Sequence, residues 1–395
     1  MTKLMHRKFV YLVFFAGFLS ACNTINLRTE FERDPAIEAQ IIDQNEDRYA
    51  DIDPLYIDDE IKSLLDRLID TNDSRAMRLA KIQTLLYDEN YLNLQYTDVK
   101  THTAIEAFQY RQGNCLSAMN LYIAMARYAG IDASFQTVEV RPEWDRRGDL
   151  LVLSRHINAT GSLGYKREYV VDFTPEIQLQ QLTANKVTDL YARALYFNNL
   201  GVEALVADDL DAAFSYFKNA LFLEPELSIA WNNIGASYNR LGNKELTEYS
   251  YQMAFLTEDK NATAVNNLAK HYRSNGDLER AERYEEAIQR FNERNPYYHF
   301  ARGEIAVEAN DLATARDAYQ DALRLKRSEP DFYLALADVY SALGEEVEAE
   351  ELRQTADAVL AGNAAIYQPS SERLRVIDNS SILNDSSVGT TIRFR

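Results

Sequence analysis

A cysteine, a histidine and an aspartate in this chain are of the types that make a nucleophilic site. Cys115 follows Gly113-Asn114 and opens the stretch 116–129, which contains no Gly or Pro. The first turn of a helix has unpaired N-H groups and the positive end of the dipole, and both stabilise the thiolate that attacks carbonyl carbon. The sequence therefore indicates an activated thiol at Cys115, with an inert core cysteine as the alternative.

His156 and Asp172 could supply the base and the group that orients it. A thiol nucleophile needs a base to take its proton, and the base needs a third group that fixes its tautomer. Strands are predicted from runs of Val, Leu, Phe and Tyr at 133–140, 149–158 and 167–173. A hairpin centred near Gly164 would set His156 directly opposite Asp172. The alternative for His156 is a solvated strand histidine with no partner.

Helices must position these strands and the thiol. The 116–129 segment is apolar nearly all round, which is typical of a central buried helix. Apolar residues at helical spacing over 53–89 predict two or three helices, and 103–110 is expected to form another short one. Helices followed by antiparallel strands make an α+β domain, predicted over 53–185.

The three residues also carry a family resemblance. Cys115 in Gly-Asn-Cys-Leu-Ser, then His156, then Asp172 in Tyr-Val-Val-Asp-Phe-Thr-Pro resembles the core of transglutaminase-like proteins, a branch of the papain-like thiol enzymes. The resemblance covers roughly residues 75–180 and implies a Cys-His-Asp triad that acts on amides, with transfer to an amine or to water. The backbone N-H of Cys115 is the expected first oxyanion donor, with Gln109 or Gln112 as candidates for the second. The family contains inactive members, so an intact triad does not by itself establish catalysis.

The N-terminus has the features of a signal peptide over residues 1–21. A basic start precedes the apolar run 9–19, which is too short to span a membrane. Leu19-Ser20-Ala21-Cys22 resembles the lipobox of bacterial lipoproteins, which implies cleavage before Cys22 and acylation of Cys22. Asn23 in the next position implies sorting to the outer membrane, facing the periplasm. An ordinary signal peptide or a short membrane helix is the alternative.

The polar, acid-rich segment 22–52 is then expected to be a lipidated tether. Cys22 and Cys115 are the two cysteines of the chain. If lipid consumes Cys22, no intramolecular disulfide can form, and Cys115 remains a free thiol in an oxidising compartment.

The second half of the chain repeats with a period of 34 residues, the length of a tetratricopeptide unit. Five units over 194–363 start at 194, 228, 262, 296 and 330 and predict a curved solenoid whose concave face binds a protein or peptide. Arg302 departs from the apolar pattern, so irregular packing is expected in the fourth unit. A ladder of paired asparagines could hold an extended peptide backbone: Asn198, Asn199, Asn232, Asn233, Asn266 and Asn267.

The expected fold is thus an α+β transglutaminase-like (papain-like) domain followed by an all-α tetratricopeptide solenoid and a polar, mobile tail over 364–395. A net charge of −19 argues against nucleic acid as a partner. No metal or cofactor is expected, because the sequence lacks a phosphate loop, a dinucleotide fingerprint and a His/Cys cluster. The sequence favours a membrane-anchored thiol enzyme that hydrolyses or transfers amides of proteins or peptides, cell-wall peptides included. A non-catalytic envelope scaffold, which would tolerate Cys115→Ser, is the alternative.

Overall fold

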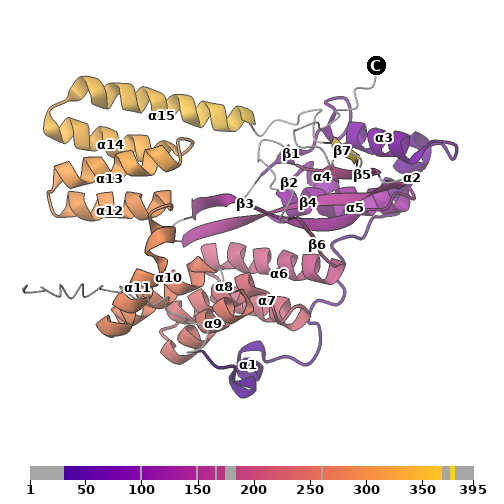
Figure 1. Ribbon diagram of the computed structural model, residues 1–395. Coiled ribbons are helices and arrows are strands. Elements are labelled where there is room, and N and C mark those ends of the chain that lie inside the picture. The colour runs from indigo at the N-terminus through magenta and orange to yellow at the C-terminus, as the bar shows by residue number, and fades with distance from the viewer. Residues whose placement is uncertain are drawn as a thin grey trace, which may run out of the picture.

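Figure 1 shows the computed structural model, in which an α+β domain lies beside a series of paired helices. The structure describes residues 31–97, 100–147, 150–164, 167–173, 184–258, 261–366 and 374–378. Along these residues, no helix is both long enough and apolar enough to cross a membrane.

The α+β domain is built around one buried helix. Its helices are α2 (Asp59–Leu68), α3 (Arg75–Tyr87), α4 (Ala104–Tyr110) and α5 (Cys115–Tyr128). Every side chain of α5 from Leu116 to Ala126 is buried, which confirms the expected central helix. Asn114 caps its start by accepting a hydrogen bond from the Ser117 backbone N-H at 2.9 Å. At the other end, Arg78 donates to the Ala129 carbonyl at 2.9 Å and so caps the last turn.

An antiparallel sheet packs against α5. Its strands run in the order β6-β3-β4-β5-β7, and a separate parallel pair joins β1 to β2. The predicted strands are present, but the central two are longer than expected, because β3 continues to Arg147 and β4 to Gly164. The bounds are β1 (Gln95–Tyr96), β2 (Gln112–Gly113), β3 (Ser134–Arg147), β4 (Leu150–Gly164), β5 (Arg167–Val171), β6 (Asn185–Lys186) and β7 (Leu374–Asp378).

The two faces of this sheet differ in chemistry. Phe135 pairs with Ala159, and Ala159 pairs with Val171, so these apolar residues share one face. The rings of Tyr122 on α5 and Tyr169 on β5 meet edge-on at 6.5 Å, so this apolar face lies against α5. Because side chains alternate along a strand, His156 lies on the other face, which we call the polar face.

The C-terminal tail takes part in the sheet. The sequence predicted a polar, mobile segment over 364–395, yet α15 extends to Ile366 and 374–378 form strand β7. β7 pairs antiparallel with β5, with Leu374 opposite Val171 and Asp378 opposite Arg167. The β-branched residues Val376 and Ile377 favour a strand, so the prediction is corrected for these residues. Residues 379–395 lie outside the described part of the chain.

Five helix pairs follow the sheet, and the later four begin where the 34-residue period starts a unit. The first pair begins earlier than predicted, because α6 starts at Asp189. The pairs are α6 (Asp189–Val206) with α7 (Leu210–Leu223), α8 (Ser228–Arg240) with α9 (Lys244–Thr257), α10 (Ala262–Ser274) with α11 (Leu278–Asn292), α12 (Pro296–Glu308) with α13 (Leu312–Leu325), and α14 (Pro330–Leu343) with α15 (Glu346–Ile366).

Glycines allow the two helices of a unit to touch. A Cβ atom at Gly235 of α8 would lie 2.8 Å from the ring of Tyr251 on α9. A Cβ atom at Gly201 of α6 would lie 2.5 Å from the ring of Phe217 on α7. The small residue and the aromatic ring are therefore complementary, as the repeat pattern predicted.

The five units do not form one continuous stack. Units one to three form one group, and units four and five form another. Within each group, the second helix of a unit packs on the first helix of the next: α7 on α8, α9 on α10, and α13 on α14. α11 and α12 make no comparable contact, and the buried residues from Tyr297 onward form a separate hydrophobic cluster. Tyr298 and Ile305 of α12 are 38% and 65% exposed. The irregular packing expected from Arg302 is therefore a break between the third and fourth units.

The segment 22–52 is not a free tether from Phe31 onward. Residues 31–52, which we call the strap, contain α1 (Pro35–Ile42) and pack on α7, α9 and α11. Tyr49 stacks on Phe197 and Tyr216 with ring centroids 5.1 and 5.2 Å apart. The tether prediction is corrected for these residues, because a few aromatic side chains in an otherwise polar segment are enough to bind it to the repeats.

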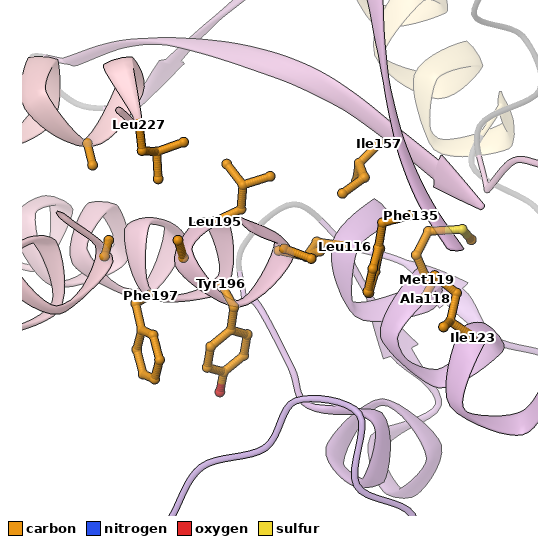
Figure 2. Close-up of a cluster of buried hydrophobic side chains, with 14 of the residues drawn as sticks. Leu116, Ala118, Met119, Ile123, Phe135, Ile157, Leu195, Tyr196, Phe197 and Leu227 are labelled. Carbon is orange, nitrogen blue, oxygen red and sulfur yellow. The ribbon is translucent and has the colours of Figure 1, made fainter. Parts of the chain in front are cut away.

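The α+β domain and the first three units share one hydrophobic core. Figure 2 shows Leu195 of α6 between Leu227, ahead of α8, and Leu116 of α5, with Ile157 of β4 nearby. An ion pair between Arg127 and Asp189, at 2.6 Å, joins the end of α5 to the start of α6. These contacts make the domain and the first three units one packed body.

Candidate active site

His156 and Asp172 form a buried pair on the polar face. His156 Nε2 lies 2.6 Å from Asp172 Oδ2, and each side chain is 2% exposed. The contact fixes the ring and leaves Nδ1 as the nitrogen that could take a proton from a nucleophile. The base and the orienting carboxylate proposed from the sequence are therefore in contact.

The strand register differs from the predicted one. Ala159 lies opposite Val171 and Gly161 opposite Tyr169, which aligns Asn158, not His156, with Asp172. The observed pairs are centred one position further along the chain than Gly164, which shifts the partner of Asp172 by two residues, and an irregularity lies between Ser162 and Gly164 near the turn. A shift of two keeps the same face, so His156 still reaches Asp172, but diagonally.

Asn158 is a site residue that the sequence reasoning missed. Its side-chain amide donates to Asp172 Oδ2 at 3.3 Å, and the residue is fully buried. Its own Oδ1 has no hydrogen-bond partner among the described residues. The sequence could have indicated it, because Asn158 stands two residues after His156 on the same strand and so lies on the same face.

Cys115 is the first residue of α5 and is half-buried. The cap beneath it is well ordered, because Asn114 also donates to Thr101 Oγ1 at 2.7 Å. Cys115 therefore lies at the positive end of the α5 dipole, as the sequence predicted. Cys115 belongs to the helix that packs against the apolar face of the sheet, whereas His156 lies on the polar face, so the contact between the thiol and the base stays a prediction.

The two glutamine candidates for the oxyanion hole occupy different elements. Gln109 is exposed near the end of α4, and Gln112 is exposed in β2, where its backbone pairs with Gln95. The backbone N-H of Cys115 lies in the first turn of α5, where helix N-H groups have no intrahelical acceptor. Neither glutamine is therefore assigned as the second donor of the oxyanion hole.

His102 is a second buried histidine close to the start of α5. Its backbone N-H donates to Ser117 Oγ at 2.7 Å, and its carbonyl accepts from the Asn120 side chain at 3.2 Å. Burial lowers the pKa of His102 below its ordinary value, although Glu106, 3.9 Å away, opposes this. Its Nε2 has no partner among the described residues. The sequence reasoning missed it, because only the fold brings its segment to α5.

Some side chains of the asparagine ladder are hydrogen-bonded to one another. Asn233 donates to Asn198 at 2.9 Å, and Asn267 donates to Asn232 at 3.0 Å. Asn198 is buried, while Asn199, Asn232, Asn233, Asn266 and Asn267 are half-buried. The ladder therefore ties neighbouring units together, and peptide binding by its half-buried members stays a prediction. Cys22, the predicted lipid attachment site, lies outside the described residues.

Comparison with known families agrees with both parts of the fold. Residues 62–168 match the model of the transglutaminase-like superfamily, and residues 266–330 and 300–365 match that of the tetratricopeptide repeat. The chain carries a transglutaminase-like domain followed by tetratricopeptide repeats.

Individual relatives that contain tetratricopeptide repeats match part of the chain. The human protein O-mannosyl-transferase TMTC3 is 30% identical over 172 residues, which are 40% of this chain and 19% of that protein. The type IV pilus assembly protein PilF of Pseudomonas aeruginosa is 26% identical over 156 residues, 38% of this chain and 59% of PilF. The chain thus spans less than two thirds of either relative.

Solved structures that match part of the chain share low sequence identity with it. The crystal structure of MamA is 17% identical and covers 42% of this chain and 97% of MamA, with a TM-score of 0.29. The P. aeruginosa PilF structure is 20% identical and covers 44% of this chain and 78% of that chain, with a TM-score of 0.33.

Proposed function

We propose that the protein is a thiol enzyme of the bacterial envelope that acts on amide bonds of proteins or peptides. Cys115 attacks the amide carbonyl, His156 takes the thiol proton and delivers it to the leaving amine, and Asp172 holds His156. The resulting thioester on Cys115 is then resolved by water or by an amine. The contact of 2.6 Å between His156 and Asp172 carries this proposal, since a buried carboxylate against Nε2 is what a catalytic histidine requires.

The remaining parts of the chain serve location and binding in this proposal. Residues 1–21 act as a signal peptide, and lipid on Cys22 anchors the protein to the outer membrane, facing the periplasm. The tetratricopeptide units bind the substrate or a partner protein. Asn199 and Asn266 are half-buried and are not the partners in the Asn233-Asn198 and Asn267-Asn232 contacts, so their amides are the ones we assign to a peptide.

One observation favours a second function, the non-catalytic envelope scaffold. His156 lies on the polar face of the sheet, whereas Cys115 belongs to α5, which packs against the apolar face, and the asparagine contacts rigidify the repeats. A scaffold would keep the His156-Asp172 pair for packing and would have no use for the thiol of Cys115.

Alkylation of Cys115 by iodoacetamide over roughly pH 4 to 9 separates the two functions. An enzyme predicts fast alkylation below about pH 7 that slows in His156→Ala and in Asp172→Asn. His271→Ala, which removes a buried histidine from the third repeat unit, is the matched control. A thiol that reacts only near about pH 8.5, equally in all variants, would establish the scaffold instead.

A further inference from the structure

The strap fixes the N-terminal end of the folded body at one point of the repeats. The Phe31 ring is buried between Phe255 of α9, edge-on at 5.7 Å, and Tyr284 of α11, stacked at 6.2 Å. Next to it, the Asp34 backbone N-H donates to the Tyr249 hydroxyl at 2.7 Å, and that hydroxyl donates back to the Asp34 carbonyl. Aromatic packing together with backbone hydrogen bonds holds this end firmly.

Further contacts hold the rest of the strap against α6 and α7. Asn219 of α7 is fully buried, and its Oδ1 accepts from the Gln44 side chain at 3.1 Å and from the Arg48 backbone at 3.0 Å. Arg193 of α6 forms an ion pair with Asp47 and donates to the Tyr49 carbonyl at 2.5 Å. Removing the strap would leave Asn219 without these donors, so the strap is part of the fold.

The strap and the transglutaminase-like sheet lie on opposite sides of the first three units. The first helices of the units, α6, α8 and α10, pack on one another, so they line the concave side. α6 also contacts β3, whereas α1 contacts α7 and α9, the second helices. Figure 1 shows the same arrangement, with α1 below α7 and α9 and the sheet above α6. The start of the strap, from Phe31 through α1, therefore covers the convex face.

The reach of the chain between Phe31 and the lipid is short. Eight residues, 23–30, separate Cys22 from Phe31. Even a fully extended chain of this length spans only roughly 30 Å, at about 3.3–3.6 Å per residue. The lipid on Cys22 must therefore enter the bilayer within this distance of α9 and α11.

We propose that the convex face of the first three units, around Phe31 on α9 and α11, faces the phospholipid bilayer, and that the His156-Asp172 site faces away from it. This orientation rests on the lipid anchor of the proposed function. It directs the candidate active site toward substrates in the periplasmic space rather than toward the membrane surface that holds the anchor.

Energy transfer on vesicles tests the orientation. The full acylated chain, with Cys115→Ser so that one thiol remains for labelling, carries a donor fluorophore at Glu286→Cys on α11 or at Glu89→Cys after α3. Both positions are exposed. The vesicles contain phosphatidylethanolamine, phosphatidylglycerol and a headgroup-labelled acceptor lipid. We expect a several-fold higher transfer efficiency from position 286 than from position 89.

A linker variant tests whether the short chain between Cys22 and Phe31 causes the orientation. A Gly/Ser insertion of about 20 residues between Glu30 and Phe31 forms a flexible coil and lengthens the reach. It should abolish the difference between the two positions. If the transfer efficiencies from positions 286 and 89 still differ with the linker, the short tether is not the cause of the orientation. If they are equal in the acylated protein without the linker, the orientation is wrong but the anchor stands. Mass spectrometry that finds no acyl group on Cys22 overturns both the orientation and the anchor.

Discussion

Asn158 donates a hydrogen bond to the same oxygen of Asp172 that His156 contacts. The carboxylate is 2% exposed, so hydrogen bonds from the protein, such as these, replace those that water would make. Asn158 therefore acts through Asp172, as a positioning residue for the histidine.

Asn158→Ala should lower the free energy of unfolding by about 1–3 kcal/mol, because it removes a donor from a buried carboxylate. Urea denaturation measures the loss. Asn266→Ala, a half-buried asparagine on α10, is the matched control and should cost less. A variant at position 158 as stable as the parent would show that Asp172 does not rely on the amide.

His102→Gln should change how stability depends on pH. Burial lowers the pKa of His102 below its ordinary value of 6.5. The folded protein then holds this proton less tightly than the unfolded chain, so stability rises with pH through the window just below 6.5 and is level above it. The glutamine variant should flatten this rise. Unfolding curves at a series of pH values test this, and an unchanged rise would assign it to other groups, such as His271.

Gly235→Ala should destabilise the second repeat unit by about 1–3 kcal/mol through overpacking. The added methyl group would meet the ring of Tyr251 at 2.8 Å and the Cβ atom of Ser250 at 3.1 Å. Adding Tyr251→Leu to the same chain should recover part of the loss, because it opens space for the methyl group. Thermal unfolding of the single and double variants measures this, and no recovery would refute the steric explanation.

Leu336→Ala should affect one of two unfolding transitions. Leu336 lies in the hydrophobic cluster of the fourth and fifth units, which is separate from the main core. The truncation should cost about 2–5 kcal/mol in the transition of these two units and leave the other unchanged. Leu268→Ala, in the third unit, should shift the other transition. Calorimetry resolves the two, and a single transition moved by both variants would mean that the stacks unfold together.

The sequence predicted the repeats well because their signals are local. Gly235 and Tyr251 stand at a fixed spacing within one unit, so the period alone marks the helix pairs. Arg302 indicated the irregular fourth unit for the same reason, because a charged side chain is costly to bury at an apolar position. The residue types of His156 and Asp172 and their shared parity were likewise enough to predict that the two side chains meet.

The predictions that failed depend on contacts between distant segments. Tyr49 packs on Phe197 and Tyr216, and nothing in its own polar neighbourhood indicates those rings. The exact register of Asp172 depends on where the hairpin turn is centred, which a count of residues cannot reveal. Pairing of 374–378 with β5 required the edge of a sheet formed much earlier in the chain.

The pairing of β7 with β5 has a consequence for synthesis. All five repeat units lie between these two strands in the chain, so a ribosome makes the entire solenoid before it makes the last strand of the sheet. Until then, β5 presents open N-H and C=O groups that can pair with other chains. Nascent protein therefore passes through a period of exposure to misassembly, and a product truncated before Leu374 would retain that open strand permanently.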